Sequence, residues 1–148
     1  MATRAKTMLD RAMVASFTAA AYIPAAFTPV KFVTDDDHVT PCDHNDVDMI
    51  GWAKYPITSA SFTAGHVQCD VVLNGTGIIP VLVADNGTAT RGKLAVGQSS
   101  SHPGYTNAAT LVAGSTLQLI QGRFMQSGVA GDYVGLLIGG VNTFGATT

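Results

Sequence analysis

The sequence predicts a small all-β protein, an antiparallel β-sandwich or barrel with an N-terminal arm that contains a short helix. Seven or more short β-rich runs recur at spacings of about ten residues, and Gly, Asn-Gly and Asp-rich turns separate them. At 148 residues the chain is long enough to bury a core without disulfides. We therefore divide it into an N-terminal arm (1–28), a β-rich core domain (29–140) and a C-terminal tail (141–148).

The arm differs in composition from the rest of the chain. Met8, Leu9, Ala12 and Met13 recur at helical spacing, which predicts a short amphipathic helix over residues 6–15. The Ala-rich run that follows superficially resembles a secretory signal, but Asp10 and Arg11 interrupt its apolar stretch. We expect the arm either to dock on a neighbouring molecule or to pack on its own domain.

The clearest strand signal covers residues 66–73, where Val67, Cys69, Val71 and Leu73 alternate with polar residues. Asn74-Gly75 supplies the positive φ angles of a tight turn. A second apolar run over 78–83 ends at Asp85-Asn86-Gly87. The two runs predict a central hairpin.

The remaining runs extend the same pattern along the chain. The longest surface loop is expected over 98–107, and the last strand is expected to be buried on both faces. The other expected strands cover residues 29–34, 38–41, 49–53, 88–97, 116–120 and 133–138.

Charge is scarce in this chain. Charged residues make up 12% of the sequence, against roughly 25% in average soluble domains. Either other subunits cover part of the surface, or Thr, Ser and Gly do the solvating. A net charge of −2 and a pI near 6.0 argue against direct nucleic-acid binding. No apolar run reaches the roughly 18 residues of a membrane span.

Five residues have side chains of the types that bind zinc: His38, Cys42, His44, His66 and Cys69. On a regular strand His66 and Cys69 point to opposite faces, and Cys69 lies among apolar neighbours, so we interpret it as a core residue. His38, Cys42 and His44 form the remaining compact subset. A disulfide between Cys42 and Cys69 stays open at this level, because sequence does not show whether they approach one another.

No catalytic motif is present. The acidic residues (Asp35, Asp36, Asp37, Asp43, Asp46, Asp48) lack the EF-hand order and are interpreted as solvated turns. Ser99 to His102 places hydroxyls beside an imidazole, but no Gly-x-Ser-x-Gly elbow, Walker loop or dinucleotide pattern occurs. Asn74-Gly75-Thr76 and Asn86-Gly87-Thr88 match the glycosylation pattern but equally suit hairpin turns. We predict no enzymatic activity, cofactor or metal.

Several of these segments together resemble a known family. Pro29-Val30 opens a strand, and Ile50-Gly51-Trp52-Ala53 stands where the family tends to have Ile-Gly-Val-Ala. Further similarities are Gly65 with Val67, Val71 and Asn74-Gly75, the strand, turn and Gly of Val81 to Gly92, and Gly131-Asp132-Tyr133-Val134. The order resembles that of small tailed-phage capsid cement or decoration proteins with a β-tulip-like core, over about Pro29 to Gly140. The arm, the 99–107 insertion and Trp52 depart from that pattern.

The resemblance implies a non-enzymatic virion protein that binds the outer capsid surface and cements neighbouring capsomers against DNA pressure. Its implied partners are the major capsid protein and further copies of itself, as a homotrimer. Synthesis is then expected in the host cytoplasm, without nucleic-acid or membrane contact. We assign capsid and subunit contacts to Arg4, Lys6, Met8, Leu9, Tyr22 and Phe27, and an outer loop to Ser99, His102 and Tyr105.

A second hypothesis comes from another functional class. A secreted or surface β-sandwich could bind carbohydrate, with Trp52, Tyr55 and Tyr105 as stacking platforms. Single aromatic residues in β-proteins are more often part of the core. Glycan-array binding would support this second hypothesis, and cytosolic expression with free thiols would count against it.

Overall fold

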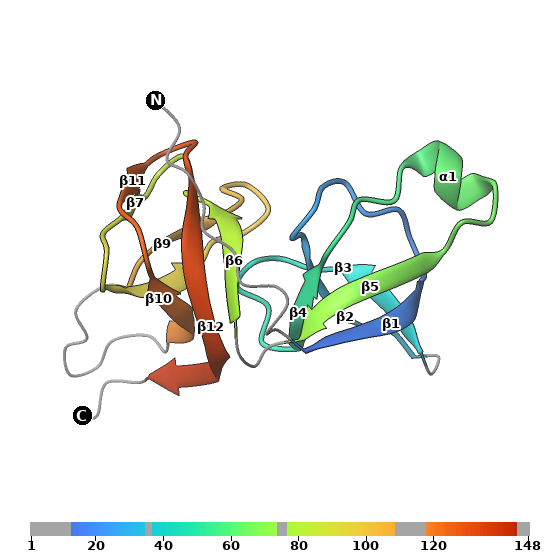
Figure 1. Ribbon diagram of the computed structural model, residues 1–148, viewed down its shortest axis with the longest axis horizontal. Helices are drawn as coiled ribbons and strands as arrows, with labels where there is room; N and C mark the ends of the chain where they lie inside the picture. The colour runs from blue at the N-terminus through green and yellow to red at the C-terminus, as the bar shows by residue number, and fades with distance from the viewer. Residues whose placement is uncertain (1–12, 35–36, 74–76, 109–117, 145–148) are drawn as a thin grey trace.

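The computed structural model describes residues 13–34, 37–73, 77–108 and 118–144, and within them the fold is mostly β. Two β units lie side by side, a closed barrel and a five-stranded sheet (Figure 1). The prediction of an all-β fold with antiparallel sheets and a barrel is confirmed. The elements are β1 (Val14–Ala19), β2 (Pro29–Phe32), β3 (His38–Pro41), β4 (Met49–Ala53), α1 (Ser59–Thr63), β5 (Gln68–Leu73), β6 (Gly77–Leu82), β7 (Thr88–Ala89), β8 (Leu94–Gly97), β9 (Tyr105–Asn107), β10 (Gln118–Phe124), β11 (Gly128–Val129) and β12 (Tyr133–Phe144).

The barrel closes in the order β1-β3-β2-β4-β5. Strand β1 pairs antiparallel with β5, with Val14 opposite Val72, and parallel with β3. Residues 14–19 therefore belong to the barrel, and the expected helix over 6–15 is wrong at residues 13–15, of which 14 and 15 are strand. Residues 6–12 of that expected helix lie outside the described residues. Ala19 is buried and Phe17 packs on the barrel core, so tertiary packing prevails over the helical spacing.

The second unit is a sheet in the order β6-β12-β10-β8-β9, accompanied by the small pair β7 and β11. Strand β12 pairs antiparallel with β10 and with β6, where Leu136 lies opposite Ile79. Because β5 lies in the barrel and β6 in this second sheet, the expected central hairpin of residues 66–73 and 78–83 is wrong. Val134, Leu136 and Ile138 are buried, whereas Tyr133 and Leu137 are 50% and 40% exposed. The expectation that this strand is buried on both faces is thus wrong, because only one of its faces meets the core. The strand also continues to Phe144, four residues into the expected tail.

Strands β4 and β5 form a wall that both units share. The core of the barrel contains Ala53, Cys69 and Val71, whereas Trp52 and Val72 belong to the core of the second sheet. Neighbouring residues on these strands point to opposite faces, so each strand contributes to both cores. This explains why Val72 is buried although its position in the alternating pattern predicts a solvent-facing side chain.

A single turn of helix, α1, projects from the barrel on the side away from the second sheet (Figure 1). Thr58 caps it, because its side-chain Oγ1 accepts a hydrogen bond from the Ser61 amide at 3.1 Å. Gly65 follows with φ +91°, a left-handed conformation suited to glycine. Nothing in the sequence pattern predicts this helix, because its five residues are too few for helical periodicity to show.

Candidate functional site

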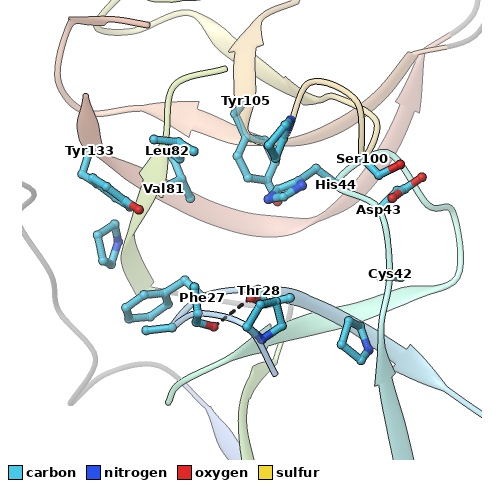
Figure 2. A pocket seen from close by; sticks show the side chains of 16 residues that line it. Phe27, Thr28, Cys42, Asp43, His44, Val81, Leu82, Ser100, Tyr105 and Tyr133 are labelled. Carbon is cyan, nitrogen blue, oxygen red and sulfur yellow. Dashed lines mark hydrogen bonds between the residues drawn. The ribbon is translucent and has the colours of Figure 1, made fainter. Parts of the chain in front are cut away.

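An apolar cleft of about 300 Å³ lies between the barrel and the second sheet (Figure 2). Loops 24–28 and 41–44 supply its barrel side, and β6 with residues 100–105 and Tyr133 supplies the other. In Figure 2, Phe27 and Thr28 face Val81 and Leu82 across the open space. Pockets between structural units, lined mainly by apolar groups, are where ligands and partner side chains commonly bind. The cleft is therefore the candidate functional site.

Phe27 stands at this cleft in a conformation rare for an aromatic residue. Its φ is +59°, in the left-handed region where a Cβ crowds the backbone. The Phe27 amide donates to the Ala53 carbonyl at 2.6 Å, and the Ala53 amide donates to the Thr28 carbonyl at 2.8 Å. Thr28 Oγ1 donates in turn to the Ala25 carbonyl at 2.7 Å. These bonds to strand β4 and within the loop hold the strained residue and its ring beside the cleft.

A buried aromatic contact between the two units borders one side of the cleft. Trp52 Nε1 donates a hydrogen bond of 2.7 Å to the Tyr105 hydroxyl, and both residues are almost fully buried. The His44 ring meets Tyr105 edge-on, with ring centroids 5.1 Å apart. Burial lowers the pKa of His44 to about 4, so the imidazole is neutral at pH 7. Burial also raises the pKa of Tyr105, which keeps its hydroxyl protonated.

The backbone of the loop over residues 42–46, which contains His44, packs directly against the second sheet. Gln121 is fully buried, and its Nε2 donates to the His44 carbonyl at 3.3 Å. A Cβ at Gly97 would overlap the same carbonyl, so this approach requires glycine. Gln121 Oε1 has no hydrogen-bond partner among the described residues. The loop over 42–46 is therefore part of the junction between the units, a role that its polar composition did not reveal.

Both cysteines are free thiols. Cys42 lines the cleft, and burial, with the Asp46 carboxylate as a smaller cause, raises its pKa to about 12. Cys69 is buried in the barrel, as its apolar neighbours in the sequence predict, and burial raises its pKa to about 11. Both thiols are therefore poor nucleophiles at neutral pH. Within the described ranges, no three His, Cys, Asp or Glu side chains gather closely enough to hold a metal ion.

The acidic residues that the structure describes act as surface and turn groups. Lys31 Nζ lies 2.7 Å from Asp46 Oδ2, and this hydrogen bond lowers the pKa of Asp46 and raises that of Lys31. Asp46 Oδ1 also accepts from the Asp48 amide, an arrangement typical of a turn. His102 is exposed in the 98–104 loop, and its Nδ1 lies 2.8 Å from Oδ1 of the exposed Asp85. An exposed pair of this kind contributes little to stability.

The predicted contact residues are only partly described by the structure. Arg4, Lys6, Met8 and Leu9 lie outside the described residues. Tyr22 is 52% exposed, and Phe27 lines the cleft. Ser99 and His102 lie in a surface loop, but Tyr105 is 1% exposed, so its assignment to the outer loop is wrong. Tyr105 begins strand β9, where its ring fills the junction and bonds to Trp52.

The same burial overturns the carbohydrate platform, because Trp52 and Tyr105 present no ring face to a sugar. Among its three proposed rings, Tyr55 alone is exposed. No protein-family model and no curated protein matches this chain. In the part of the chain that the structure describes, no helix has the length and apolar character needed to cross a membrane.

Proposed function

We propose that this chain is a structural protein of a tailed-phage head, which binds the outside of the capsid and cements neighbouring capsomers. The observation that carries the proposal is the combination of few charges with many exposed apolar side chains. Nine large hydrophobic residues of the described ranges are exposed: Met13, Val14, Tyr22, Phe32, Val47, Tyr55, Val129, Tyr133 and Leu137. Such a surface suits a protein whose faces are covered by other subunits.

The proposed mechanism is mechanical. Each copy buries part of its apolar surface against the assembled shell, and anything that binds only the assembled state stabilises it by mass action. Many weakly bound copies suffice when each bridges two capsomers. The shared β4–β5 wall and the buried Trp52–Tyr105 bond support this role, because they couple the two units into one body that can bear load.

The proposed partners are the major capsid protein and further copies of the chain, as a trimer. Tyr22 and Phe27 are the aromatic anchors of the described part, and Arg4, Lys6, Met8 and Leu9 are the proposed contacts of the preceding segment. Ser99 and His102 belong to the loop that faces away from the shell. The protein would then be made in the host cytoplasm and reside on the outer surface of the virion.

Co-sedimentation tests this proposal. Capsids that lack the chain are mixed with purified protein and pelleted, and unassembled major capsid protein serves as the control. The proposal expects saturable binding to capsids and much weaker binding to the unassembled subunit. Equal binding to both, or none to capsids, would refute the cement function.

A further inference from the structure

The cleft is an apolar surface that the described residues leave open. Val81 and Leu82 of β6 and the exposed Tyr133 ring of β12 form one side, and Phe27 lies opposite (Figure 2). A volume of about 300 Å³ stands at the lower end of the range for ligand pockets. It suits a few inserted apolar side chains better than a large cofactor. A strained aromatic residue beside such a cleft is a feature that often accompanies a binding role.

The electrostatic setting of the cleft favours a positively charged occupant. Asp43 lines it, and none of the Lys or Arg side chains in the described ranges does. Over residues 13–148 the sequence has five Lys and Arg against nine Asp, a net charge of −4. His44, which also lines the cleft, adds no positive charge at neutral pH because its pKa is about 4.

Residues 1–12 of the same chain have the complementary chemistry. Arg4, Lys6 and Arg11 against Asp10 give this segment a net charge of +2. Met8 and Leu9 lie between the basic residues, so two large apolar side chains are flanked by positive charge. Met13, the residue that follows this segment, lies beside the end of β5, where its carbonyl accepts a hydrogen bond from the Leu73 amide at 2.9 Å.

We propose that residues 4–11 of one copy bind in the cleft of a neighbouring copy, with Met8 and Leu9 against its apolar walls. This contact is head-to-tail, so it closes into a ring when the rotation between copies allows, as in a trimer. The inference rests on the proposed structural role, which requires surfaces covered by other subunits. It assigns to the segment and to the cleft the contact between copies, and leaves the capsid contact to other surfaces.

The native mass of the full chain and of three variants tests the proposal. The double variant Met8→Asp/Leu9→Asp removes the apolar side chains of the segment, and Tyr133→Glu places a charge in the cleft. Tyr133 is 50% exposed, so this substitution leaves the core intact. Tyr55→Glu is the matched control, because Tyr55 is 57% exposed and does not line the cleft. The wild type and the control are expected as oligomers, and the other two as monomers with unchanged circular dichroism.

A mixing experiment identifies the direction of the contact. The segment variant retains an intact cleft, and the Tyr133→Glu chain retains an intact segment. Their mixture is therefore expected to form a one-to-one dimer and nothing larger, because only one pairing remains possible. A wild-type monomer, oligomers unaffected by either change, or a mixture that stays monomeric would each overturn the proposal. A monomeric wild type would be the result if the segment occupied the cleft of its own chain.

Failure of this inference can be distinguished from failure of the cement function. If the segment variant keeps its oligomeric mass while the wild type still binds capsids, the cleft proposal fails and the cement function stands. If the variants dissociate as expected but no chain binds capsids, the cement function fails and the contact between copies stands.

Discussion

The Trp52–Tyr105 hydrogen bond gives the sharpest prediction about how the two units are joined. The variant Tyr105→Phe keeps the ring, including its edge contact with His44, and removes only the hydroxyl. Trp52 is 0% exposed, so its Nε1 is then a buried donor without its hydrogen-bond partner. Leaving such a group unsatisfied costs about 1–3 kcal/mol. With a urea m value of about 2 kcal/mol/M, the unfolding midpoint falls by about 0.5–1.5 M.

Urea unfolding followed by tryptophan fluorescence measures this change directly, because Trp52 is the one tryptophan of the sequence. Tyr22→Phe is the matched control, since Tyr22 is 52% exposed and its loss of a hydroxyl is expected to cost less than about 0.5 kcal/mol. Circular dichroism should report the same midpoint as fluorescence, because the shared wall makes the two units unfold together. Equal midpoints for Tyr105→Phe and the control would refute the reasoning.

Three further predictions concern the same junction. Gly97→Ala places a methyl group on the His44 carbonyl and should lower stability by about 3 kcal/mol or more, or roughly 6–12 °C in thermal midpoint; an unchanged midpoint contradicts this close approach. Because the folded-state pKa of His44, about 4, lies below the ordinary value of 6.5, the unfolded chain binds the proton more readily. Stability should therefore be full above pH 6.5 and fall by up to about 3 kcal/mol as the pH drops to 4, and His44→Gln should flatten this part of the pH profile. With thiol pKa values of about 12 and 11, Cys42 and Cys69 should react with iodoacetamide at pH 7.5 more than tenfold slower in the folded chain than in urea, and equal rates would refute their burial.

Local patterns predicted many elements of this fold. The runs at residues 38–41 and 49–53 coincide with β3 and β4, because each is a short segment bounded by turn residues. The interpretation of Cys69 as a core residue is also confirmed, since its neighbours on that face are apolar. Alternation within one strand depends only on residues close together in the sequence, so it can be recognised without knowing how the rest of the chain folds.

The shared wall and the cleft could not be predicted in this way. Val72 is buried because a second core lies on the outer face of β5, and nothing within that strand indicates a partner beyond the barrel. Tyr105 lies in a turn-rich stretch, and its burial depends on Trp52, which is 53 residues away. The loop at His44 looks polar, yet its backbone is seated against Gln121 and Gly97. These features arise from contacts between distant segments, which periodicity does not encode.

The stability of particles against heat is the direct test of the cement function. Particles assembled with and without the chain are heated at the same ionic strength, and release of DNA is followed with an intercalating dye. We expect release at a higher temperature when the chain is bound, with a shift that grows with occupancy until the sites are full. Release at the same temperature with and without the chain would contradict the cement function.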